Sequence, residues 1–142
     1  MKIALDVLGG DLAPMANIEG AMAYLNEYGD SAAELILVGD EKTIKSLLHS
    51  YSYNNSKVHI VHTTEVVGMH EKPSRIFKEK PDSSIVKSIQ LVNAGKADAA
   101  VSAGNTGALL ASSLFLIGKI PGIRRPAFAP FIPSYKRRIH SL

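Results

Sequence analysis

Five short apolar runs, separated by polar and turn-forming residues, predict the strands of a buried sheet. Each run is only a few residues long and is rich in Val, Ile, Leu or Ala, which suits strands better than helices. The runs are Lys2–Leu8, Glu34–Val38, Val58–Val61, Ala97–Val101 and Ala127–Ile132.

Between the first runs, apolar residues recur at the three-to-four-residue spacing of amphipathic helices. The first predicted helix occupies residues 14–28 and ends at Gly29, because glycine commonly follows the C-terminus of a helix. Asp40 is a good N-cap for the second helix, whose inner face carries Ile44 and Leu48.

Two further helices are predicted in the second half of the chain. Asp82 or Ser83 is expected to cap the third helix, and Gly95 is expected to end it. The fourth extends over residues 106–117 and stops at Gly118. Both helices connect predicted strands, as in a chain that alternates between the two kinds of element.

This alternation of strands and helices predicts right-handed βαβ units and a mostly parallel sheet. We therefore expect a three-layer α/β/α, Rossmann-like domain over residues 1–133, followed by a basic tail of unclear origin at 134–142. The last apolar run would leave the sheet with an open edge, so the domain is expected to be incomplete at its C-terminus.

The composition fits a globular α/β domain and excludes several kinds of site. Of 142 residues, 46% are hydrophobic and 20% are charged, and there is no cysteine to form a disulfide, a thiolate nucleophile or a metal ligand. His59 and His62 lie three apart in a predicted strand and so point to opposite faces, and no metal site is expected. No signal peptide or long apolar span is visible, which favours a cytoplasmic protein.

Candidate chemistry begins with a small-residue loop that opens directly into the fourth predicted helix. Gly104 and Gly107 allow a ligand to approach the backbone, and Ser102, Asn105 and Thr106 offer side-chain hydrogen bonds. The helix directs its free N–H groups and the positive end of its dipole to the same place. This layout predicts an anion site, although no G-x-G-x-x-G or Walker pattern is present.

A second glycine-bearing loop follows the first predicted strand. Parallel sheets collect such loops at one edge, so we expect both loops to share one crevice. Gly9 and Gly10 would admit phosphate, Asp11 would orient a donor, and Asp6 at the strand end would order the loop. The alternative is a pair of tight connections, with Asp11 as a local turn cap. Ser102 is not expected to be a nucleophile, because no G-x-S-x-G elbow or assignable histidine accompanies it.

Residues 63–81 are charged and weakly periodic, which predicts a long loop with one short helix near 74–78. Long loops in compact domains are often functional. Lys72 could pair with phosphate as a point charge and Arg75 as a bidentate donor, or both could bind an acidic protein. The alternative is that they are ordinary solvated charges.

Both glycine-bearing loops belong to a longer series of motifs: Asp6–Pro14, Leu37–Asp40, Glu71–Pro73, Lys80 with Asp82–Ser84, Gly95–Ala99, Ser102–Ala108 and Arg125–Ala127. This series resembles, in the same order, the PlsX family of phosphate acyltransferases of fatty acid and phospholipid synthesis. The resemblance extends from Met1 to about Pro133. Leu12 replaces a histidine of the family motif, so the role of that histidine does not transfer. The chain is less than half the usual family length, and we interpret it as an N-terminal piece.

The resemblance implies that inorganic phosphate attacks the thioester of an acyl-acyl carrier protein, which yields acyl-phosphate. Positioned donors suffice for this chemistry, so no cofactor is expected. The implied partners are acyl carrier protein, phosphate and a second copy in a homodimer, with peripheral contact to the inner face of the membrane and no nucleic acid. The expected catalytic residues are Asn105, Asp11 and Lys72. The expected substrate- and phosphate-binding residues are Gly9, Gly10, Ser102, Gly104, Thr106, Gly107, Arg75 and Arg125.

Two other classes of function compete with this interpretation. One is a non-catalytic α/β module that binds an anion or a phosphorylated metabolite. The other is a nucleic-acid binder, which the net charge of +3 and the basic stretch at 136–138 favour. No nucleic-acid motif or aromatic stacking platform accompanies that charge. Ionic strength separates the two, because nucleic-acid affinity falls steeply with salt whereas a small-anion pocket responds less.

Overall fold

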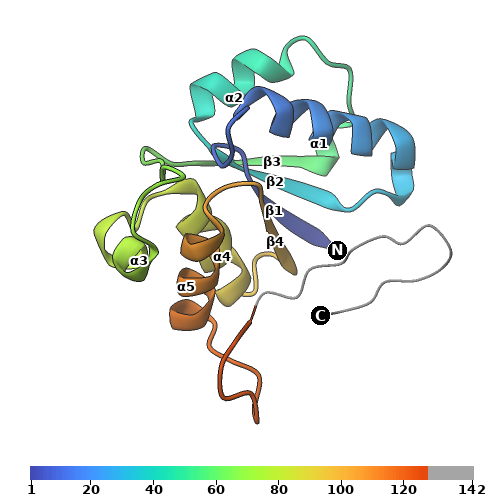
Figure 1. Ribbon diagram of the computed structural model, residues 1–142. Helices are drawn as coiled ribbons and strands as arrows, with labels where there is room; N and C mark the ends of the chain where they lie inside the picture. The colour runs from blue at the N-terminus through green and yellow to red at the C-terminus, as the bar shows by residue number, and fades with distance from the viewer. Residues whose placement is uncertain (128–142) are drawn as a thin grey trace, which may run out of the picture.

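A parallel sheet with the strand order β3-β2-β1-β4 forms the centre of the computed structural model, which describes residues 1–127 (Figure 1). The predicted parallel sheet and its α/β alternation are confirmed. The strand predicted at 127–132 and the tail at 134–142 lie outside the described residues, apart from Ala127. The strands are β1 (Lys2–Asp6), β2 (Glu34–Gly39), β3 (Val58–His62) and β4 (Ala99–Ser102).

The helices follow the predicted periodicity closely. Asp40 caps α2 as expected, since its Oδ1 accepts a hydrogen bond of 2.8 Å from the Thr43 N–H. In the part of the chain that the structure describes, no helix is long and apolar enough to span a lipid bilayer. The helices are α1 (Met15–Tyr28), α2 (Glu41–Leu48), α3 (Ile76–Glu79), α4 (Ser84–Asn93) and α5 (Thr106–Leu116), with short 3-10 turns η1 (Gly29–Ser31), η2 (Asn55–Lys57) and η3 (Pro73–Arg75).

The prediction that Asp82 or Ser83 caps α4 is confirmed in position, since Ser83 is the N-cap residue, but the side chains behave differently from a usual cap. Ser83 occupies the N-cap position but makes no side-chain cap bond, because its Oγ donates to the Lys80 carbonyl at 2.7 Å. The Asp82 carboxylate accepts a bond of 2.9 Å from the Thr64 N–H instead. Both side chains therefore fix the preceding loop. Ser83 is the N-cap residue, as predicted, but no side-chain bond accompanies it.

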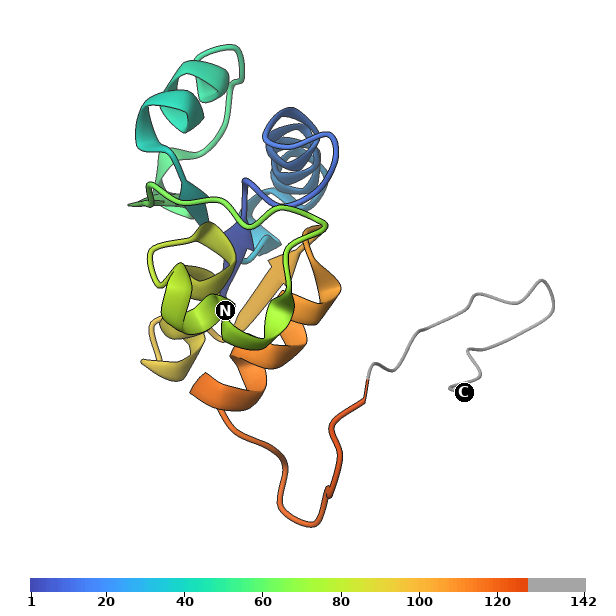
Figure 2. The same cartoon turned by 60° about the vertical axis from the view of Figure 1, so that its left-hand side comes forward.

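Helices cover both faces of the sheet, as Figures 1 and 2 show from two directions. The largest core cluster lies between the sheet and the pair α1 and α2, and it includes Ile18, Met22, Leu37 and Ile44. On the opposite face, α4 packs against β1, β2 and β4, and α5 packs outside it against α4, α3 and η3. The layers are therefore those of a Rossmann-like domain.

The strand order also fixes where a ligand site is expected. From β1 the chain proceeds outward through β2 to β3, and it then crosses back to place β4 on the other side of β1. The direction of progression thus reverses between β1 and β4. In open parallel sheets, ligands bind beyond the carboxyl ends of the strands at such a reversal point. The segments after β1 and β4 are the two loops that the sequence singled out.

Candidate anion-binding site

The β1 loop (residues 7–14) and the β4 loop (residues 103–105) lie in direct contact. A Cβ atom added to Gly9 would be 2.9 Å from the Gly104 backbone nitrogen, and one added to Gly10 would be 3.1 Å from the Ala103 carbonyl oxygen. Gly10 also has a φ of 107°, a left-handed conformation that favours glycine. The glycines therefore permit the close approach of two backbones, and the structure brings the two predicted loops together.

Side-chain hydrogen bonds connect the two loops to the strands below them. Asp6, only 1% exposed at the end of β1, accepts a bond of 2.7 Å at Oδ2 from the Ser102 hydroxyl. The Ser102 Oγ accepts in turn from the Gly104 N–H at 3.0 Å. On the other side, the Asn17 side-chain amide of α1 donates to the Gly9 carbonyl at 2.8 Å. The loops are thus held by named polar contacts as well as by packing.

A cavity of about 290 Å³, here called the loop cavity, lies over the β1 loop. Within the described residues, the backbone N–H groups of Gly9, Gly10 and Asp11 donate to no protein acceptor. Unused N–H groups beside a cavity are the usual means of binding an oxyanion. The residues that line it are Gly9, Gly10, Asp11, Leu12, Ala13, Ala16, Asn17 and Ala103.

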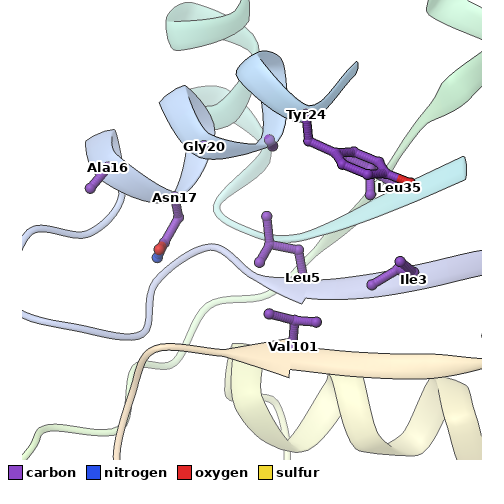
Figure 3. Close-up of a pocket in the computed structure, with 9 residues that line it drawn as sticks. Ile3, Leu5, Ala16, Asn17, Gly20, Tyr24, Leu35 and Val101 are labelled. Atoms are coloured by element: carbon purple, nitrogen blue, oxygen red, sulfur yellow. The ribbon is translucent and has the colours of Figure 1, made fainter. Parts of the chain in front are cut away.

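A second hollow, the apolar groove of about 340 Å³, adjoins the loop cavity and shares Ala16 and Asn17 with it. Figure 3 shows α1 on one side of this groove and β1 and β4 on the other, with Val101 on its floor. Its width comes from small residues on α1, since a Cβ added to Gly20 would meet nothing within 4 Å. Sequence reasoning missed the groove, although Ala16 and Gly20, four apart on one helix, were a signal for it. The remaining lining residues are Ile3, Leu5, Ala21, Tyr24 and Leu35.

Asn105 is buried at the start of α5, and its side chain is fully used by neighbouring backbone groups. Its Oδ1 caps the helix by accepting from the Ala108 N–H at 3.0 Å. Its Nδ2 lies 3.1 Å from the carbonyl oxygens of Gly68, Met69 and Glu71. In this arrangement Asn105 shapes the site by joining α5 to the long loop. Its expected catalytic role stays a prediction.

The expected cations lie outside the lining of the loop cavity. Lys72 and Arg75 are exposed on either side of the Pro73 turn, and a Cβ added to Gly107 would be 2.8 Å from Pro73 Cγ. Gly107 therefore permits the long loop to pack on α5. Arg125 is exposed in the segment after α5, which Figure 1 shows extending away from the sheet. The binding roles predicted for these residues and for Thr106 stay predictions.

An ion pair between Lys80 and Glu71 also fixes the long loop. Both residues belong to the motif series of the sequence, where neither was given a role. Lys80 Nζ lies 2.6 Å from Glu71 Oε1 and also donates to the Val66 carbonyl at 2.8 Å. The same Glu71 oxygen accepts from the Gly68 N–H at 2.7 Å. The bond from Lys80 and, to a smaller extent, the bond from the Gly68 N–H hold the pKa of Glu71 below its usual value of 4.5.

Acidification is expected to loosen the loop around Gly68. Because folding lowers the pKa of Glu71, its stabilising contribution is present above the usual value of 4.5 and is lost as the pH falls through the lowered folded value. Hydrogen exchange of the Gly68 amide, expressed as a protection factor, should therefore decrease in this acid range. Glu71→Gln should remove the pH step, and an identical step in that variant would contradict this assignment.

The described residues bring no metal-binding cluster together. His59 bonds to Glu34 at 2.9 Å, and His62 Nδ1 accepts from the Glu41 N–H at 3.1 Å, so each ring is paired locally. Over residues 1–127, no group of three or more His, Cys, Asp or Glu side chains is placed to bind a metal ion. The candidate site itself contains backbone N–H groups, the Ser102 hydroxyl, the Asn17 amide and the carboxylates of Asp6 and Asp11.

Comparison with known proteins agrees with this geometry. The sequence model of the family described as fatty acid synthesis protein matches residues 1–141. Proteins named phosphate acyltransferase are similar in Dictyoglomus turgidum (51% identity over 94% of this chain and 39% of the relative), Exiguobacterium sp. (49%, 95% and 40%) and Clostridioides difficile (46%, 96% and 39%). The chain thus spans about two fifths of the length of these curated relatives. With its two glycine loops meeting at the reversal point of the sheet, this chain belongs to the fatty acid synthesis protein family, the PlsX family that its motifs resemble.

Proposed function

We propose that this chain contributes the phosphate-binding part of a phosphate acyltransferase, which transfers a fatty acyl group from acyl-acyl carrier protein to inorganic phosphate. The observation that carries this proposal is the contact between the two glycine loops beside unused backbone N–H groups. The names of the relatives support the reaction class. The neighbouring apolar groove supports a substrate with a hydrocarbon chain.

In the proposed reaction, a phosphate oxygen attacks the thioester carbonyl carbon and forms a tetrahedral oxyanion. The carbon–sulfur bond then breaks, the carrier thiol leaves with a proton from solvent, and acyl-phosphate remains. N–H groups of Gly9, Gly10 and Asp11 would bind the phosphate. A donor that also stabilised the tetrahedral oxyanion would typically lower the barrier by about 3–4 kcal/mol. Lys72 and Arg75 would add positive charge from the long loop, and Asn105 would hold that loop against α5.

The proposed partners follow from the same assignment. Acyl carrier protein would deliver the acyl group, and the whole protein would act in the cytoplasm as a homodimer at the inner surface of the membrane. Exposed apolar side chains on the loop side and after α5, among them Leu12, Ile117 and Ile120, support contact with another apolar surface. Arg125 follows the last two in the sequence, is exposed in the same segment after α5, and would complement an anionic surface.

The direct experiment is acyl-phosphate formation from palmitoyl-acyl carrier protein and phosphate, followed by trapping the product with hydroxylamine. The phosphate acyltransferase of Dictyoglomus turgidum serves as the full-length reference. Turnover by this chain would place the chemistry within these residues. A folded chain that binds phosphate without turnover, beside an active full-length reference, would make this chain either an incomplete active site or an anion-binding module. A chain that binds no phosphate would contradict both.

Filling the apolar groove is expected to weaken binding of a long acyl chain. Gly20→Leu places a side chain in open space and also removes a glycine from the interior of α1, so the fold should be kept. Loss of a few buried methylene groups, each worth about 0.8 kcal/mol, should raise the dissociation constant of palmitate about tenfold. Isothermal titration with palmitate measures this change.

Glu19→Leu is the matched control, because Glu19 is exposed on the same helix and does not line the groove. Equal weakening by both substitutions would contradict the acyl assignment. Absence of palmitate binding to the unsubstituted chain, with phosphate binding intact, would contradict the acyl assignment of the groove and leave the phosphate-binding proposal standing.

A further inference from the structure

The Asp6 carboxylate is buried beneath the candidate site, and the proposed chemistry gives it no role. It is 1% exposed, and within the described residues its Oδ1 has no hydrogen-bond partner. Burial of a carboxylate is costly unless the group is paired or hydrogen-bonded. A group with only one protein hydrogen bond in such a place points to a role in the site above it.

The Asp6 side chain bonds to Ser102, the residue before the β4 loop, which is distant from Asp6 in sequence. In the parallel ladder between β1 and β4, Asp6 lies opposite Ser102, and the two side chains bond across 96 residues of sequence. The Ser102 hydroxyl has a single proton and donates it to Asp6, so its lone pairs are left for the Gly104 N–H. One carboxylate oxygen thereby sets the orientation of the β4 loop.

The same oxygen also lies directly below the β1 loop. A Cβ added to Gly9 would overlap Asp6 Oδ2, and one added to Gly104 would be 3.3 Å from it. Asp6 therefore supports both loops at their point of contact, on the protein side of the backbone. The loop cavity is lined by the other side of these loops, through Gly10 and Ala103, and Asp6 is not among its lining residues.

We propose that Asp6 and Ser102 are positioning residues that join the β1 and β4 loops into a single phosphate-binding unit. This inference rests on the proposed function, because it concerns the same site. Neither side chain touches the anion. The pair keeps the β4 loop, including Ala103, against the β1 loop so that both respond together to one bound phosphate.

The negative charge of Asp6 allows a positioning role to be distinguished from a purely electrostatic one, because the two predict opposite changes in phosphate affinity. A buried negative charge near an anion site weakens anion binding when it acts through its field alone. Asp6→Asn, which keeps the shape of the side chain, would then tighten phosphate binding. A positioning role predicts the opposite result, because the charge-assisted bond to Ser102 is lost.

The test is a titration of the ¹⁵N-labelled chain with inorganic phosphate, observed at the amide signals of Gly10 and Gly104. In the unsubstituted chain, both signals should shift with one dissociation constant. Ser102→Ala should raise that constant about tenfold, as for the loss of one charge-assisted hydrogen bond, and the Gly104 signal should shift much less than the Gly10 signal. Ser102→Thr keeps the hydroxyl and should restore both properties.

Ser88→Ala provides the matched control, because Ser88 is also a buried serine but donates to the Ser84 carbonyl within α4. It should leave phosphate binding unchanged. If Ser102→Ala does not fold, Asp6→Asn alone decides, and tighter phosphate binding in that variant overturns the proposal. Unchanged, coupled shifts in a folded Ser102→Ala chain also overturn it and leave the anion site intact. Absence of any phosphate shift in the unsubstituted chain overturns the anion site itself.

Discussion

Replacing Asn105 with alanine is expected to lower the free energy of unfolding by about 3 kcal/mol. The substitution removes the N-cap of α5, typically worth about 1 kcal/mol. It also removes a part-buried amide whose two N–H protons are shared among the carbonyls of Gly68, Met69 and Glu71, which costs roughly 1 kcal/mol for each of two hydrogen bonds. In a domain of this size, thermal unfolding should occur about 6–12 °C lower.

Asn105→Asp separates the contribution of the helix cap from that of the amide bonds to the long loop. It keeps the oxygen that accepts from the Ala108 N–H, but it places a carboxylate against carbonyl oxygens where the amide donated. We therefore expect Asp to be no better than Ala, although Asp is an excellent cap in isolated helices. Recovery of most of the stability in the Asp variant would show that capping alone accounts for Asn105. Activity of either variant is informative only at temperatures where it is folded.

Gly9→Ala is expected to be at least as damaging, by about 3 kcal/mol or more. The added methyl group would overlap the Asp6 carboxylate and approach the Gly104 nitrogen to 2.9 Å. Neither neighbour is the free end of a flexible side chain, so the two loops must separate. Chemical denaturation should show the loss of stability, and phosphate binding should weaken with it.

Gly20→Ala offers a matched glycine substitution with the opposite expected sign. A Cβ at this position meets nothing within 4 Å, and Gly20 lies inside α1, so alanine should stabilise the fold by up to about 1 kcal/mol. Similar stability of the Gly9→Ala and Gly20→Ala variants would contradict the close packing of the two loops.

The main elements could be predicted from the sequence because their signals are local. The spacing of Ile18, Met22 and Leu25 predicts α1, and Asp40 predicts the start of α2. The β1 strand ends at Asp6, two residues before the predicted end, because the chain turns at Leu8 to bring Gly9 against the β4 loop. Apolar character alone could not reveal that turn.

The contacts that organise the site could not be predicted, because they join distant parts of the chain. Nothing near Ser102 in the sequence indicates that its hydroxyl bonds to Asp6. Asn105 has the residue type of both an anion ligand and a helix cap, and only the position of the Gly68–Glu71 turn shows that its amide is already used. Likewise, Ser83 is a typical cap residue that donates to Lys80 instead.

The pairing of β1 with β4 has a consequence for how the domain folds. β1 pairs with β2 about 30 residues away through the local βαβ unit that contains α1, whereas Asp6 and Ser102 are 96 residues apart. During synthesis β1, α1 and β2 emerge well before β4, so the largest core cluster can assemble first. The anion site is therefore expected to form last and, on partial unfolding, to be lost first. A chain that has only begun to fold would have the largest core cluster of this domain without its candidate anion site.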